Sequence, residues 1–266
     1  MSLQAEKFSD LWVRMGSGAV IAVVALVCVW LGGFAFLALC CVLTGALVWE
    51  LVGMLGGGPR RAWLLGAGSA GAFLAVSLLP LGVGLPFILL PSIAGIALLP
   101  RNRTLYMIFT ALIIIAAYGL WVQRSDFGFT WMLWLALVVM VTDVAGYFAG
   151  RFIGGPKFWP RVSPKKTWSG TIAGWVGAGI VGLCFLGQPG VGAEVIGISI
   201  AISMASQMGD IAESAMKRKM GVKDSSNLIP GHGGVFDRFD GMLGASVFLL
   251  MIEQIVDFPP VPSILF

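Results

Sequence analysis

Most side chains that could do chemistry lie in or next to one polar stretch, residues 214–240, which reads SAMKRKMGVKDSSNLIPGHGGVFDRFD. It holds the only histidine of the chain, His232, among glycines that let a backbone approach a ligand closely. Asp237 and Asp240 follow, three residues apart, where the next apolar run begins. Carboxylates beside lysines indicate a divalent cation that holds a polyphosphate, and oxygen ligands favour Mg²⁺. Zinc is disfavoured because His232 has no Cys or His companions.

The preceding apolar run ends in a polar stripe. Asp210, Glu213, Ser214 and Lys217 are spaced so that they share one face of a helix. Such a stripe lines a cavity or is a solvated helix end, and the spacing alone leaves both interpretations open.

A further carboxylate, Asp143, lies inside another apolar run, and Tyr147 follows one helical turn later. A charge in such a run is costly unless it faces a cavity, a cation or a basic partner. Asp143 therefore marks a functional site, or it forms an ion pair that only holds helices together.

The loop after that run brings two lysines to the start of the next one. Lys165 and Lys166 supply positive charge, and Thr167, Ser169 and the free N–H groups of a helix start supply donors. This combination suits phosphate. Ordinary positive charge on the cytoplasmic side of a membrane explains the lysines equally well.

The composition is that of an integral membrane protein. The 266 residues are 58% hydrophobic and 11% charged, whereas soluble domains carry about 25% charged residues. Uninterrupted apolar runs of helix length predict an all-α, polytopic membrane bundle rather than a barrel of alternating strands. The runs lie at about residues 17–32, 34–56, 62–80, 83–100, 104–122, 128–149, 170–187, 191–212 and 239–257.

Charge asymmetry supports about nine transmembrane helices, with the N-terminus inside the cell and the C-terminus outside. In this orientation every lysine and arginine except Arg124 falls on the cytoplasmic side. The net charge of +4 therefore reflects topology and predicts no nucleic-acid partner. We divide the chain into an N-terminal membrane region, 1–125, for packing, lipid contact or dimerisation, and a C-terminal catalytic membrane region, 126–266.

The chain carries no GxxxxGK[ST] motif and no strand-flanked GxGxxG, so a phosphate site must be built from membrane helix ends. Residues 214–240 contain the pattern S-x-M-K-R-x4-K-D-x-S-x2-I-P-x-H-G-G-V-x-D-R-F-D. This pattern resembles the signature of CDP-diacylglycerol synthases, the phosphatidate cytidylyltransferases. Residues 143–151 and 163–168 also resemble that family, whereas the first 125 residues resemble it only in hydropathy. Ser169 departs from the family, which often has Glu there, so any role of that carboxylate is in doubt here.

The resemblance implies a nucleotidyltransferase of phospholipid biosynthesis. Its reaction is CTP plus phosphatidate to CDP-diacylglycerol and pyrophosphate, with Mg²⁺; whether a monovalent cation such as K⁺ joins it stays open. The metal ligands it implies are Asp210 and Asp237, with Asp240 and Asp143 as weaker candidates. Catalytic residues are then Asp210, Asp237, Lys217 and Arg218. Residues for substrate binding are Tyr147, Lys165, Lys166, Thr167, Ser214, Lys223, His232, Gly233, Gly234 and Arg238.

From the size and compactness of the chain we expect a bacterial cytoplasmic (inner) membrane, with the active site on the cytoplasmic side, and we expect a homodimer as the assembly. Three other classes remain. An ion-coupled transporter would use Asp143 and glycine-rich helices, but its polar residues belong near the membrane midplane. A CDP-alcohol phosphotransferase or a CTP-dependent lipid kinase would act on a related lipid phosphate, but the DGxxAR…GxxxD…D pattern of the former is absent, since Asp240-Gly241 is not followed by Ala-Arg at the right spacing. A structural membrane subunit explains the apolar runs but not the cytoplasmic cluster.

Overall fold

The computed structural model describes residues 3–256 and Phe258, and the described chain is mostly helical. It divides into two compact units. The first comprises the chain up to Trp121 together with Met220–Phe239, and the second comprises Val122–Lys219 and the chain from Asp240 onward. The stretch 220–239 thus packs with the N-terminal helices.

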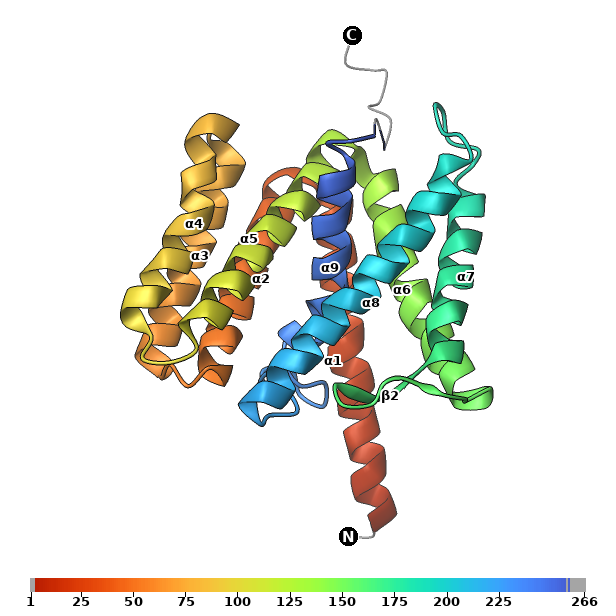
Figure 1. Ribbon diagram of the computed structural model, residues 1–266, viewed down its shortest axis with the longest axis horizontal. Coiled ribbons are helices and arrows are strands. Elements are labelled where there is room, and N and C mark those ends of the chain that lie inside the picture. Colours follow the sequence, from red (N-terminus) through yellow and green to blue (C-terminus); the bar gives the residue numbers. More distant parts are fainter. Residues whose placement is uncertain (1–2, 257, 259–266) are drawn as a thin grey trace. The chain divides into compact units, whose positions relative to one another are not determined.

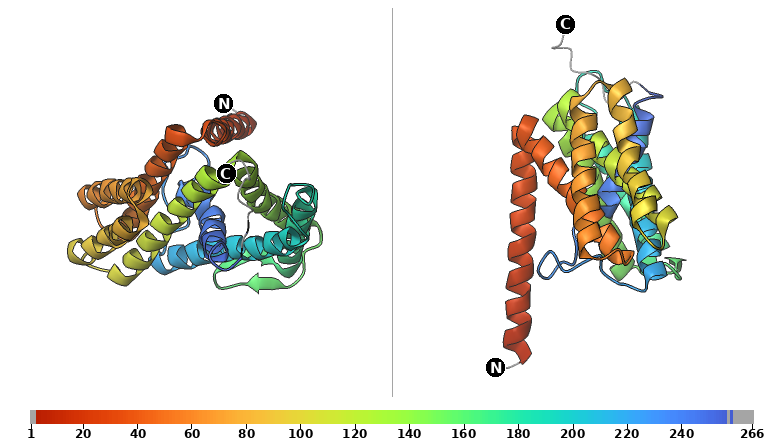
Figure 2. Two further views of the ribbon diagram at one scale, coloured as in Figure 1. Left: turned by 90° about the horizontal axis from the view of Figure 1, so that it is seen from above. Right: turned by 90° about the vertical axis from the view of Figure 1, so that its left-hand side faces the viewer.

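The first unit contains α1 (Leu3–Leu31), α2 (Gly33–Met54), α3 (Pro59–Leu78), α4 (Leu81–Leu98) and most of α5 (Arg103–Asp126) (Figure 1). Gly32, with a φ of 63°, separates α1 from α2, and Pro59 opens α3. Neighbouring helices α2, α3 and α4 pack in sequence order. Both views of Figure 2 show α1 to one side of this group.

The second unit contains α6 (Gly128–Phe152), α7 (Trp168–Cys184), α8 (Glu194–Met220) and most of α9 (Phe236–Ile252). Helices α6 and α7 pack closely because glycines remove side chains from their contact. A Cβ atom on Gly170 would lie 2.5 Å from the carbonyl oxygen of Gly146. This contact places the N-terminus of α7 beside the cytoplasmic half predicted for α6.

The link between α6 and α7, which we expected to be a loop, contains a short antiparallel hairpin of β1 (Lys157–Trp159) and β2 (Ser163–Thr167). Its strands pair Lys157 with Thr167, and the Trp168 N–H donates to the Pro156 carbonyl. The rings of Phe158 and Trp168 pack edge to face. The hairpin fixes where the lysines of β2 lie relative to the start of α7.

Nine helices in the described chain correspond in order to the nine predicted apolar runs, so the helical fold class is confirmed. Five of the described helices, α2, α3, α5, α6 and α8, are long and apolar enough to cross a membrane. Shorter apolar helices lie at Met15–Leu31, Pro86–Leu98 and Trp168–Cys184. Helix α9 has 17 residues and carries three charged side chains among its first five residues. Nine crossings and the orientation therefore stay predictions.

Candidate active site

A cavity of about 610 Å³ opens in the second unit between α6, β2, α7 and α8. It is lined by Thr142, Asp143, Gly146, Tyr147, Gly150, Arg151, Lys165, Lys166, Thr167, Gly170, Thr171, Gln207 and Asp210. Basic and acidic side chains face one another in this cavity, although most of the surrounding helix surface is apolar. The three glycines lie on α6 and at the start of α7, where the two helices approach each other.

Asp210 is the most connected acidic residue of this cavity. Its Oδ2 forms an ion pair with Lys166 Nζ, and the Ser214 hydroxyl donates to its Oδ1 over 3.2 Å. Both partners of the ion pair remain partly exposed, at 27% and 29% of their side-chain area. Asp143 and Asp240 lie within electrostatic range of Asp210. Lys166 therefore acts on two of these carboxylates, Asp210 and Asp143, whereas the cation that acts on Asp240 is Lys217.

Tyr147 and Thr167 are oriented by neighbours in the cavity wall. The Arg151 guanidinium donates to the Tyr147 hydroxyl over 2.8 Å. Thr167 Oγ1 is the N-cap of α7 and accepts from the Gly170 N–H over 3.2 Å. Ser169 donates to the Gly154 carbonyl, so this hydroxyl ties the helix start to the end of α6. The hydroxyls of Thr167 and Ser169 thus form hydrogen bonds with backbone groups, whereas the Lys165 side chain is exposed.

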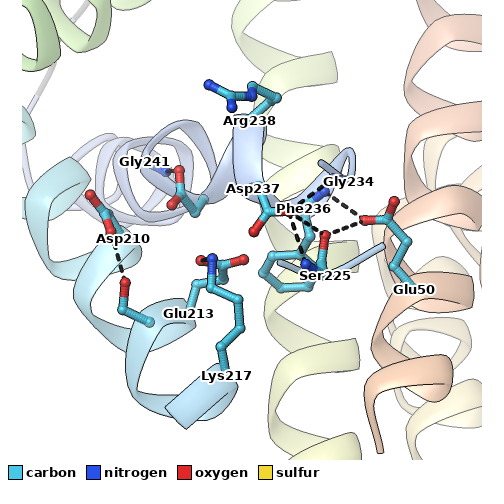
Figure 3. Close-up of polar contacts among 12 residues, drawn as sticks. Glu50, Asp210, Glu213, Lys217, Ser225, Gly234, Phe236, Asp237, Arg238 and Gly241 are labelled. Carbon is cyan, nitrogen blue, oxygen red and sulfur yellow. Dashed lines mark hydrogen bonds and ion pairs between the residues drawn. The ribbon is translucent and has the colours of Figure 1, made fainter. Parts of the chain in front are cut away.

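The stripe on α8 is more buried than a solvated helix end. Glu213 is 1% exposed and pairs with Lys217 one turn later. Arg218, the next residue, is exposed. The carboxylates of Asp210 and Glu213 therefore differ. Asp210 lines the cavity, whereas Glu213 is buried and forms an ion pair with Lys217 (Figure 3).

In the first unit, the segment 221–235 forms a polar pocket of about 440 Å³. It is lined by Lys223, Asp224, Asn227, Ile229, Pro230, Gly231, His232, Gly233 and Arg238. The Arg238 guanidinium donates to the His232 carbonyl, and Ser17 Oγ lies 2.9 Å from the Nδ1 atom of the His232 ring. His232 therefore holds this segment on α1.

Asp237, a predicted metal ligand, accepts hydrogen bonds from the same segment through one carboxylate oxygen. Its Oδ2 accepts hydrogen bonds from the Ser225 N–H and hydroxyl, both over 2.9 Å, and from the Gly234 N–H over 2.8 Å (Figure 3). Asp237 thus fixes the fold of the segment that precedes α9.

Glu50 of α2 is a functional candidate that our reading of the sequence did not single out. This carboxylate is 1% exposed and accepts four hydrogen bonds, from Ser225 Oγ (3.0 Å), Ser226 Oγ (2.6 Å), Val235 N–H (2.9 Å) and Phe236 N–H (2.8 Å). The available signal was an acidic residue inside a long apolar run. Its partners lie 175 or more residues away and cannot be identified from spacing.

The structure sorts the predicted site residues into two groups. Those of the second unit that line its cavity are Asp143, Tyr147, Lys165, Lys166, Thr167 and Asp210. Ser214, Lys217 and Asp240 interact with this set, whereas Arg218 points to the surface. Those of the first unit are Lys223, His232, Gly233, Gly234, Asp237 and Arg238, all in or next to 221–235. Their roles toward ligands stay predictions.

The acidic side chains of the second unit bear on whether it could hold a divalent cation. No group of three or more His, Cys, Asp or Glu side chains with the arrangement of a metal site occurs within the described residues. Mg²⁺ does not require one, because it is commonly held by one or two carboxylates with substrate phosphates and water. Asp210 and Asp143 line the cavity, and Asp240 lies within electrostatic range of both. All three offer only oxygen ligands, so this group fits Mg²⁺ better than a softer metal.

The chain is similar to phosphatidate cytidylyltransferases of several bacteria. A phosphatidate cytidylyltransferase of Brucella suis biovar 1 (strain 1330) is 46% identical over 156 residues, which are 57% of this chain and 57% of that protein. Those of Bacillus subtilis (strain 168) and Staphylococcus haemolyticus (strain JCSC1435) are 38% and 36% identical, over 49% and 64% of their lengths. The matched part is thus about half to two thirds of each relative. The family profile described as "Cytidylyltransferase family" matches residues 12–256. The chain belongs to the cytidylyltransferase family.

Proposed function

We propose that this chain transfers the cytidylyl group of CTP to phosphatidate and releases pyrophosphate, in the synthesis of phospholipids. The observation that carries the proposal is the cavity of the second unit, in which Lys165 and Lys166 meet Asp210 and Asp143 at the ends of apolar helices. The names of the relatives point to the same reaction.

In this reaction an oxygen of the lipid phosphate attacks the α-phosphorus of CTP. A new P–O bond forms, the bond between the α-phosphorus and the bridging oxygen to the β-phosphate breaks, and pyrophosphate leaves with its electron pair. The nucleophile is already anionic at neutral pH, so no strong general base is needed. The barrier comes from bringing two polyanions together, and catalysis is positioning plus electrostatic stabilisation.

The cavity residues suit these tasks. Lys165, Lys166 and Arg151 supply positive charge toward phosphate oxygens, and the exposed ring of Tyr147 covers one side. Asp210, with Asp143 or Asp240 as a second ligand, would hold Mg²⁺, which when bound neutralises phosphate charge and orients the leaving group. Asp237 stays a proposed metal ligand. The loop pocket with Lys223 and His232 is proposed to contact CTP.

The setting follows from the substrates. Phosphatidate arrives within the bilayer and CTP from the cytosol, so we propose a site at the cytoplasmic face of a bacterial inner membrane. Apolar side chains such as Val144 and Phe148, exposed on α6 next to the cavity residues, suit contact with lipid. A homodimer is proposed for the assembly.

The test is product formation by the purified protein in detergent, with radiolabelled CTP and phosphatidate. We expect labelled CDP-diacylglycerol that disappears with a chelator and returns with Mg²⁺. Repeating the assay in K⁺ and in a large organic cation tests for a monovalent ion. No product from folded protein, beside an active relative as control, contradicts the proposal.

A further inference from the structure

Glu50 lies in a helix of the N-terminal region, yet every hydrogen-bond donor that contacts it belongs to the segment 225–236. We propose that Glu50 is a positioning residue, which holds this segment in the shape that the cytidylyl transfer requires. The inference rests on the proposed function for its catalytic consequence, but the positioning itself can be measured without any reaction.

One carboxylate closes the segment at both of its ends. Ser225 and Ser226, near its start, donate their hydroxyls to the two oxygens of Glu50. Val235 and Phe236, at the start of α9, donate their backbone N–H groups to the same two oxygens. An anion at a helix N-terminus is favoured by the free N–H groups and by the helix dipole. Glu50 therefore anchors α9 and the loop before it together.

The anchor is connected directly to Asp237. The Ser225 hydroxyl lies 3.0 Å from Glu50 Oε2 and 2.9 Å from Asp237 Oδ2. Since this hydroxyl has one proton, it can donate to only one of the carboxylates at a time. A displacement of Glu50 would thus change the environment of a proposed metal ligand through Ser225.

Gly234 provides independent support for a close approach of Glu50. A Cβ atom at Gly234 would lie 2.7 Å from both carboxylate oxygens of Glu50 and 1.9 Å from Ser225 Oγ. Only glycine leaves room for the carboxylate to reach the N–H groups beyond it. The glycine of the loop and the glutamate of α2 are therefore parts of one arrangement.

The variant Glu50→Gln separates hydrogen bonding from packing. Each carboxylate oxygen accepts one backbone N–H, from Val235 or from Phe236. In either orientation of the amide, the NH₂ group faces one of these donors. An isosteric change thus leaves a buried N–H unpaired. Glu50→Asp keeps both acceptor oxygens but shortens the side chain, so it leaves a small void and longer hydrogen bonds.

The experiment compares E50Q, E50D and a control, T44V, in purified full-length protein. Thr44 is a suitable control because it is also buried in α2, and its hydroxyl donates to Cys40 of its own helix. Hydrogen exchange by mass spectrometry follows peptides that cover 225–240. We expect exchange at least tenfold faster in E50Q, an intermediate rate in E50D and the wild-type rate in T44V. The kcat/KM for CTP should fall in the same order, at least 30-fold in E50Q.

The order of the two Glu50 variants decides the proposal. If Glu50 only fills space, E50D accelerates exchange and lowers kcat/KM at least as much as the isosteric E50Q. That result overturns the proposal. Wild-type exchange of 225–240 in E50Q also overturns it. If E50Q is not recovered folded, E50D and S226A decide, because Ser226 donates to the same carboxylate. If Glu50 positions the segment, the effects of E50D and S226A on exchange are not additive in the double variant. Additive effects refute the proposal. If E50Q exchanges faster but the wild-type protein shows no cytidylyl transfer, Glu50 still anchors the segment and the proposed function is wrong.

Discussion

At the scale of single residues, Lys166 is the cation that two carboxylates of the cavity share. It pairs with Asp210 and also acts on Asp143. We expect Lys166→Met to lower cytidylyl transfer about 10²- to 10³-fold, since it removes a fixed positive charge from the reacting phosphates. Initial rates at varied CTP and phosphatidate measure this effect. Lys157→Met is the control, because Lys157 is exposed on β1 of the same hairpin. Activity of the Lys166 variant within twofold of this control contradicts the assigned role.

Asp237 is predicted to act twice, as a metal ligand and as an anchor of the loop. Asp237→Asn replaces a carboxylate that accepts three hydrogen bonds with an amide of the same size. We expect at least a 100-fold loss of activity, a higher Mg²⁺ concentration for half-maximal rate, and faster exchange of peptides around Ser225 and Gly234. Rates across a Mg²⁺ titration, with Glu194→Gln as the control at an exposed carboxylate, measure the first two effects. An unchanged Mg²⁺ requirement would remove the metal role and leave only the anchor.

Sequence reasoning identified residues whose own chemistry is conspicuous, and missed a residue whose importance comes from its partners. Asp143 and Lys166 stood out because charge in or beside an apolar run is costly, and the structure places both in one cavity. Glu50 carried the same signal, but it had no polar neighbours along α2. Its role depends on a loop far along the chain, and such contacts depend on the tertiary fold.

At the scale of elements, glycines determine how α8 and α9 meet in the second unit. A Cβ atom on Gly209 would lie 2.4 Å from the Asp240 carbonyl, and one on Gly244 would lie 2.4 Å from that of Ala205. This backbone contact sets Asp210 and Asp240 on neighbouring helices. From the sequence, glycines could be interpreted only as small residues that favour packing, because their partners depend on the fold.

We therefore expect Gly244→Ala to destabilise the protein by about 1–3 kcal/mol, since the added methyl group forces the two helices apart. Gly197→Ala is the matched control, because a Cβ atom there meets no atom within 4 Å and alanine favours a helix. Thermal unfolding of the purified variants in detergent measures both. The expected result is a lower Tm for Gly244→Ala and an unchanged or higher Tm for Gly197→Ala. Equal Tm values would show that α8 and α9 do not pack this closely in the membrane protein.

At the scale of the whole molecule, the number of helices could be predicted from apolar runs because hydrocarbon requires backbone groups to be paired within a helix. The hairpin β1–β2 was missed, since its few residues lie in a polar connection without an alternating pattern. Orientation rests on charge alone. Every basic residue except Arg124 falls on one side if nine spans cross with the N-terminus inside.

This topology predicts opposite exposure for the two ends of α7. The 17 residues of this helix extend about 25 Å at 1.5 Å per residue, close to the ~30 Å of a hydrocarbon core. In a variant whose Cys28, Cys40, Cys41 and Cys184 are replaced by serine, single substitutions Lys157→Cys and Gln188→Cys mark the polar segments before and after α7. In intact cells a membrane-impermeant maleimide should label the Gln188 variant, whereas the Lys157 variant should react only after lysis. Active variants with the reverse pattern would place the cavity of the second unit on the wrong side for cytosolic CTP, and labelling of both from outside would mean that α7 does not cross.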